Sequence, residues 1–195
     1  MSSELQTYLE KLRACEICKA EMDRAPNPIV RATETARILI AGQAPGNLAD
    51  VHSKPFADPS GVRLRDWMGV SDEEFYDETR IAIAPMGFCF PGYDGKGGDR
   101  PPMKICAPTW RAGLLERMPN VELVLAIGGY AQRWHLAGSQ AKTLTATVHD
   151  WRMHLESGVL PTPHPSWRNN GWLKRHPWFE NEVLPELRAR VRALL

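Results

Sequence analysis

Apolar residues along the chain form short unbroken runs that alternate with longer amphipathic stretches. The runs are rich in strand formers and too short for helices, and they predict strands buried on both faces at Ile38–Ala41, Arg80–Ala84, Val121–Ile127 and Val159–Leu160. Helices are predicted over Leu5–Leu12, Val62–Met68, Ala107–Met118, Tyr130–Leu136, Leu144–Trp151 and Glu182–Leu195. This alternation predicts an α/β fold with a parallel sheet, right-handed crossovers and helices on both faces.

The first buried strand opens into a turn of small residues, Gly42–Asn47 (GQAPGN). Small residues let a ligand approach the backbone closely, and Pro45 fixes the turn while donating no hydrogen bond. Doubly wound α/β folds place their ligand sites beyond the carboxyl ends of such strands. The turn therefore predicts a ligand site, with a plain β-to-α turn as the alternative.

Composition and charge set the broad class of the protein. A chain of 195 residues can bury one sizeable core, so we expect a single domain over 1–195. The net charge of +1 neither demands nor excludes a nucleic-acid partner, and any basic surface must be local. The N-terminal stretch MSSELQTYLEKLRAC does not resemble a signal peptide, and no apolar run reaches membrane-spanning length. We expect a cytoplasmic monomer that does not bind membranes.

The chain has four cysteines, at Cys15, Cys18, Cys89 and Cys106. Structural disulfides are disfavoured in the cytosol, and a CxxC pair can place two thiolates on one metal. The other two cysteines flank a long irregular loop, which a shared metal centre would hold to the N-terminal helix. Four thiolates can bind Zn²⁺ or a [4Fe–4S] cluster, while the alternative is that some are buried free thiols.

Several motifs occur in an order that resembles the uracil-DNA glycosylase superfamily. They are GQAPGN after the first strand, KPF about ten residues later, the layout of the four cysteines, and HPSWRNN near the end. The iron–sulfur branch, whose first motif reads GEAPG, is the most similar. The resemblance implies a three-layer α/β/α fold with a four-stranded parallel sheet. It also implies a [4Fe–4S] cluster on Cys15, Cys18, Cys89 and Cys106.

The resemblance further implies a role for each matching residue. Gly42, Ala44, Pro45 and Gly46 would form the floor of a pocket for a base flipped out of the DNA, and Phe56 would stack on that base. His164 would stabilise the departing base, which leaves as an anion. Ser166, Trp167 and Arg168 would enter the minor groove. The implied function is excision of uracil or another deaminated or modified base from DNA in base excision repair.

Two positions depart from the family pattern. The iron–sulfur branch has Glu where this chain has Gln43, and an amide can orient a water but cannot take its proton. Asp50 could supply the missing charge. The family also has a base-reading Asn four residues before the third cysteine, where this chain has Pro85, so the identity of the excised base stays open.

Other interpretations of the same residues remain. Phe56 could fill the core beneath a loop, His164 could be an ordinary hydrogen-bonded histidine, and Asp50 and His52 are expected to be solvated loop residues. Trp172 and Trp178 are assigned to core packing. At the level of the whole protein, the alternatives are a catalytically silent nucleic-acid-binding module and a hydrolase of a small N-glycoside.

Overall fold

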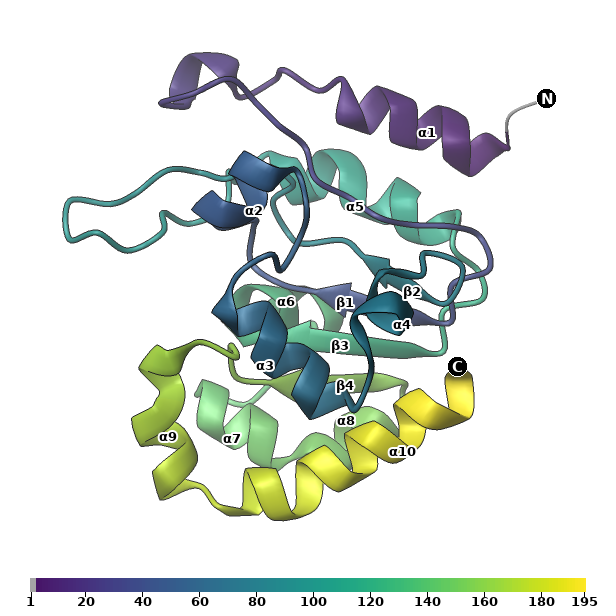
Figure 1. Cartoon of the computed structure of the whole chain (residues 1–195), viewed down its shortest axis with the longest axis vertical. Coiled ribbons are helices and arrows are strands. Elements are labelled where there is room, and N and C mark those ends of the chain that lie inside the picture. The colour runs from purple at the N-terminus through teal and green to yellow at the C-terminus, as the bar shows by residue number, and fades with distance from the viewer. Residues whose placement is uncertain (1–2) are drawn as a thin grey trace.

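The structure is a computed structural model that describes residues 3–195. Its centre is a four-stranded, all-parallel sheet in the order β2-β1-β3-β4 (Figure 1). The strands are β1 (Ile38–Ala41), β2 (Ile81–Ile83), β3 (Leu123–Ile127) and β4 (Val159–Thr162). Ile38 pairs with both Ile81 and Leu123, so β1 is hydrogen-bonded on both edges. The predicted strands are confirmed, and β1 and β2 are buried throughout because helices cover both faces.

Helices pack on both faces of the sheet and give it three layers (Figure 1). On one face, α1 (Glu4–Arg13) and α5 (Cys106–Glu116) bury Leu5, Leu9, Leu12 and Leu114 against Leu39 and Ala82. On the other, α3 (Pro59–Met68) and α10 (Leu184–Leu194) cover Ile38, Ile40 and Ile83. Further helices are α6 (Gly128–His135), α7 (Leu144–His149), α8 (Trp151–Leu155) and α9 (Asn170–Arg175). The predicted α/β/α architecture is confirmed.

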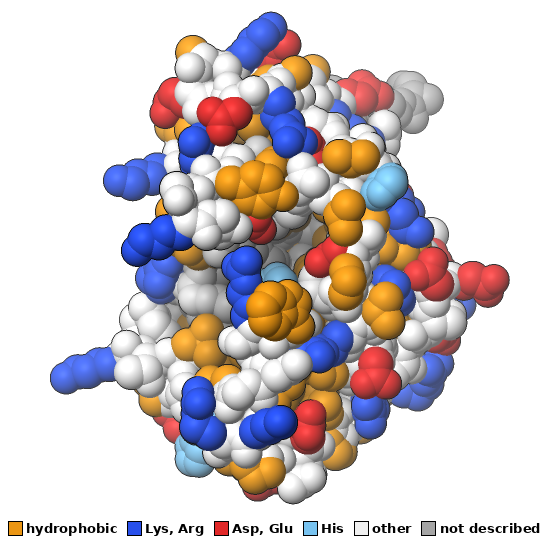
Figure 2. Space-filling view, turned by 60° about the vertical axis from the view of Figure 1, so that its left-hand side comes forward, with side chains coloured by type: hydrophobic (Ala, Val, Ile, Leu, Met, Phe, Trp, Pro, Cys, Tyr) orange, Lys and Arg blue, Asp and Glu red, His pale blue; other side chains and the backbone are white. Residues whose placement is uncertain are grey.

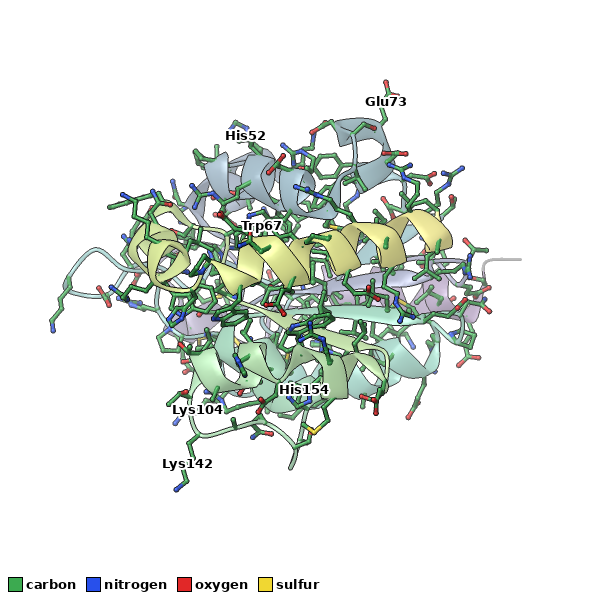
Figure 3. The ribbon with its side chains drawn as sticks, turned by 90° about the horizontal axis from the view of Figure 1, so that it is seen from below. His52, Trp67, Glu73, Lys104, Lys142 and His154 are labelled. Atoms are coloured by element: carbon green, nitrogen blue, oxygen red, sulfur yellow. The ribbon has the colours of Figure 1, made fainter. Side chains whose placement is uncertain are left out.

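Aromatic side chains join the C-terminal part of the chain to the sheet. Trp67 of α3 lies next to α10 and packs edge-on against Phe179, with 5.0 Å between ring centroids (Figure 3). Trp172 and Trp178 pack on the same core, as predicted, and Trp172 donates a hydrogen bond to Thr145 at 2.8 Å. Phe179–Val183 forms a single π-helical turn before α10 begins.

Some helices differ from the sequence prediction. The segment predicted as one helix over Leu144–Trp151 is two helices, α7 and α8, because Asp150 leaves helical geometry at φ −84° and ψ 20°. A short helix that was not predicted, α2 (Asn47–His52), follows the GQAPGN turn. The helix α4 (Asp72–Tyr76) begins with a full capping box formed by Ser71 and Glu74. Within residues 3–195, no helix is long and apolar enough to cross a membrane.

Candidate active site

The first motif lies at the carboxyl edge of the sheet, joined to the loop that follows β2. Met86 N–H donates to the carbonyl of Gly42 at 2.8 Å, and Gly87 N–H donates to that of Gln43 at 2.9 Å. These bonds extend the β1–β2 pairing past the ends of both strands. The floor predicted for a base pocket is therefore fixed by backbone hydrogen bonds on the β2 side.

Phe56 lies directly over the motif. A side-chain carbon placed on Gly42 would be 3.8 Å from the tip of the Phe56 ring, which is ordinary contact distance. Phe56 itself has a left-handed backbone conformation, with φ of +54°, which non-glycine residues rarely adopt. Tyr76 of α4 donates its hydroxyl hydrogen to the Pro55 carbonyl at 2.9 Å, and Phe75 meets the Phe56 ring edge-on. These contacts hold the half-buried Phe56 ring beside the Gly42–Gly46 loop, where the sequence predicts it.

Gly61 of α3 allows this conformation, and its replacement gives a testable prediction. A Cβ on Gly61 would lie only 1.9 Å from the Phe56 carbonyl oxygen, so the backbone would have to shift. We expect Gly61→Ala to lower the free energy of unfolding by about 1–3 kcal/mol, the usual cost of overpacking, as measured by urea denaturation. Gly95→Ala is the control, because nothing lies within 4 Å of its Cβ position. Equal stability of the two variants would contradict this account of the Phe56 turn.

His164 follows β4 at the same edge of the sheet. It lies between two buried prolines, and its carbonyl accepts a hydrogen bond from the Asn169 side chain at 2.7 Å. Burial lowers the pKa of His164, against the opposing effect of the Asp58 and Asp99 carboxylates. The imidazole is therefore neutral at neutral pH, a form in which one ring nitrogen donates and the other accepts a hydrogen bond.

Two acids beside His164 were not singled out from the sequence. Asp58 caps α3, where its carboxylate accepts hydrogen bonds from Ser60 and from Gly61 N–H. Asp99 comes from the long loop after β2 and approaches Gly46. No local pattern marks either residue as part of this site, since Asp58 resembles an ordinary helix cap and Asp99 lies in a glycine-rich loop.

Gln43 holds that long loop against the motif. Its amide nitrogen donates to the Arg100 carbonyl at 3.1 Å. Arg100 in turn pairs with Asp23 of the N-terminal segment at 3.0 Å. One amide hydrogen of Gln43 therefore has a structural partner, while its amide oxygen remains able to accept a hydrogen bond.

Asp50 differs from its prediction as a solvated loop residue. It lies in α2, is only 9% exposed, and pairs with Arg24 at 2.8 Å. Its charge is thus neutralised by the N-terminal segment. His52 is exposed, as predicted, and points away from the molecule at the end of α2 (Figure 3).

The segment after His164 presents the residues predicted to contact DNA. Trp167 is 71% exposed, and Arg168 stacks on its ring with 5.9 Å to the centroid. Arg63 of α3 anchors this segment by donating to the Ser166 carbonyl at 3.2 Å and to the Asn170 side chain at 2.8 Å. Figure 2 shows a hollow on one face of the molecule, with Lys and Arg side chains along part of its margin. Basic side chains therefore gather locally although the net charge is +1.

A buried arginine fixes the end of β2, where Pro85 stands. Arg111 of α5 is fully buried and donates to the carbonyls of Ala84 at 2.8 Å and Pro85 at 3.1 Å. It also contacts the ring of His135. Burial first, and then the Arg111 charge, lower the pKa of His135 to about 3, so that ring stays neutral and can accept from the guanidinium.

The four cysteines surround one cavity, between the turn after α1, the loop after β2 and the start of α5. Apolar side chains, among them Leu12, Phe88 and Trp110, form the rest of its lining. Burial raises the pKa of Cys89 to about 12 and that of Cys106 to about 11, and neighbouring cysteines add to both shifts. The structure therefore brings together the cysteines of both halves of the predicted ligand set.

Two backbone N–H groups are directed at cysteine sulfurs of this cavity. Phe88 N–H donates to the sulfur of Cys106 at 3.4 Å, and Asn27 N–H donates to Cys89. Such hydrogen bonds to cysteine sulfur are among the features that tune iron–sulfur centres. Across residues 3–195, no three Cys, His, Asp or Glu side chains are grouped as ligands of a single metal ion.

The fold and site define a three-layer α/β/α protein whose candidate pocket lies at the carboxyl edge of a parallel sheet. The sequence model of the uracil DNA glycosylase superfamily matches residues 30–188 of the chain, and the protein belongs to that superfamily. A solution NMR structure of a candidate uracil DNA glycosylase from Methanosarcina acetivorans is similar in part. It has 17% sequence identity and a TM-score of 0.48, and the match covers 85% of this chain and 94% of that chain.

Proposed function

We propose that this protein is a DNA glycosylase that hydrolyses the N-glycosidic bond of uracil, or of another deaminated or modified base, in DNA. The observation that supports this most directly is the neutral His164 at the same sheet edge as the Gly42–Gly46 loop and the Phe56 ring. A base-excising enzyme needs a pocket floor, an aromatic surface and a donor for the leaving base, and these residues offer all three.

Each step of the proposed reaction uses groups of this chain. Trp167 enters the space left by the flipped nucleotide, and Arg168 pairs with a phosphate. The base stacks on Phe56 over the motif loop. As the C1′–N bond breaks, negative charge develops on the base, and the N–H of His164 stabilises it. A neutral imidazole fits this role because a donor fixed in place acts on charge that appears only in the transition state.

The identity of the base depends on what replaces the family's Asn at Pro85. Proline has no side-chain donor or acceptor, and the Pro85 carbonyl already accepts a hydrogen bond from Arg111. A site without that amide loses a reader of the base edge, which relaxes or redirects base selection. We therefore propose a substrate range that is not restricted to uracil.

We also propose that Cys15, Cys18, Cys89 and Cys106 bind a [4Fe–4S] cluster, as in the iron–sulfur branch, with Zn²⁺ as the alternative. The cluster would be structural and would hold the turn after α1, the loop after β2 and the start of α5 together. The support is the convergence of the four thiols on one cavity and the two N–H groups directed at cysteine sulfurs.

The decisive experiment is base release from a panel of oligonucleotides that carry uracil and other deaminated or modified bases. We expect release of at least one base, together with DNA affinity that falls steeply as salt concentration rises. DNA binding without release of any base would instead indicate a silent binding module. Cleavage of free nucleosides with no affinity for DNA would indicate a hydrolase of small N-glycosides.

A further inference from the structure

We propose that Asp99 is a catalytic residue of this site, whose carboxylate takes a proton from the water that attacks the sugar. The inference rests on the proposed function and adds to it the general base that the first motif lacks. Gln43 occupies the position of the family's Glu, and an amide cannot accept that proton.

The geometry places Asp99 at the motif although 53 positions separate it from Gly46. A side-chain carbon on Gly46 would lie 3.8 Å from Oδ2 of Asp99, so the carboxylate borders the motif loop. The loop is held there by the neighbouring residue: Gln43 donates to the Arg100 carbonyl, and the Arg100 side chain pairs with Asp23. Gln43 thus positions the loop that carries Asp99, the proposed general base.

The charges around Asp99 agree with this position. Partial burial is the largest influence on Asp99 and raises its pKa overall. The charges of Arg168 and His164 lower the pKa, whereas those of Asp58 and Asp94 raise it, so Asp99 lies near both the leaving-group donor and the DNA-contacting segment. A raised pKa makes a carboxylate a stronger base, as long as it remains ionised at the working pH.

The two other acids near the motif, Asp58 and Asp50, already have hydrogen-bond or ion-pair partners. Asp58 accepts from Ser60 and from Gly61 N–H as the cap of α3, and Asp50 pairs with Arg24. Within residues 3–195, no group donates a hydrogen bond to the Asp99 carboxylate. It lies exposed at the margin of the site, where a water can reach it.

The chemical step balances with water as the only co-reactant. The water oxygen bonds to C1′ as the C1′–N bond breaks, and its proton passes to the Asp99 carboxylate. The electron pair of the broken bond leaves with the base, which is stabilised by His164 and then takes up a proton. The products are an abasic sugar with a hydroxyl at C1′ and the free base.

The test is the rate of a single turnover, at saturating protein, measured from about pH 4 to about pH 9 on a nucleobase that the wild type releases. We expect Asp99→Asn to lower this rate by about 10²-fold or more, within the usual contribution of a general base. The wild-type rate should fall as the pH drops through the pKa of Asp99, because a protonated Asp99 cannot take the proton from the attacking water. That acid limb should be absent from Asp99→Asn and retained by Asp99→Glu.

Asp94→Asn is the matched control, since it removes the same charge from the same loop. Asn keeps the side-chain oxygen that accepts from Lys96 N–H and Gly98 N–H, so the turn is preserved. Because the Asp94 charge helps to raise the pKa of Asp99, we expect this variant to move the acid limb to lower pH while the rate above the limb stays at the wild-type value. An Asp99→Asn variant that excises at the wild-type rate, keeps the acid limb or loses only DNA affinity would overturn the inference while the proposed function stands. A wild-type protein that releases no base would overturn both.

Discussion

His164→Ala is expected to slow base excision in a single turnover by about 10²–10³-fold, the usual effect of removing one preorganised donor. His164 follows β4 between two buried prolines, which limit its backbone freedom before the substrate arrives. Burial keeps its ring neutral, so the N–H is available without a proton from solution. Quenched-flow or manual time courses with protein in excess over DNA would measure the effect.

Two comparisons make this prediction specific. His52→Ala removes an exposed imidazole that points away from the molecule, and it should excise at the wild-type rate (Figure 3). Trp167→Ala and Arg168→Ala should show the opposite pattern to His164→Ala, with weaker DNA binding and a smaller effect on the bound chemical step. If His164→Ala excises the base as fast as the wild type, the leaving-group mechanism is wrong.

The sheet could be predicted from sequence because its strands are buried on both faces. A short run such as Ile38–Ala41 has no polar face to turn toward solvent, and it is too short to show a helical period. A strand buried on both faces is the structure that such a run predicts. The start of α4 also depends on local chemistry, since Ser71 and Glu74, three residues apart, form its cap. The order of the strands, in contrast, depends on long-range pairing that no local pattern encodes.

The errors in prediction have physical causes of the same kind. The α2 helix has only six residues, so its periodicity is weak, and its Asp50 could not be recognised as half of an ion pair with Arg24. Asp150 ends α7 although the residues on both sides of it have helical spacing. Asp99 reaches Gly46 only through the tertiary fold, because its loop is held by Gln43 and Asp23. The roles of the candidate site residues themselves stay predictions.

Cys89→Ser is expected to abolish the metal centre and to lower the melting temperature. Protein purified without oxygen should be brown and hold about four irons per chain, and the variant should lose both properties. In the wild-type protein, burial raises the pKa of the Cys89 thiol to about 12. The folded apoprotein therefore keeps a protonated thiol where a cluster would bind a thiolate. Cluster binding is therefore coupled to proton release and to folding. Met103→Leu is the control, because Met103 lines the same cavity but is not part of the thiol set.

Loss of the centre should also loosen α2, because Asn27 connects the cysteine cavity to that helix. Its backbone N–H bonds to Cys89, and its side chain donates to the Asp50 carbonyl at 2.9 Å and to Ser53 at 3.1 Å. Cys89→Ser should therefore increase hydrogen exchange in α2 and in the loop after β2, while β3 and β4 stay protected. Stoichiometric zinc in protein prepared with iron available would contradict the iron–sulfur assignment but leave the ligand set intact. Unchanged iron content in Cys89→Ser would contradict the ligand set itself.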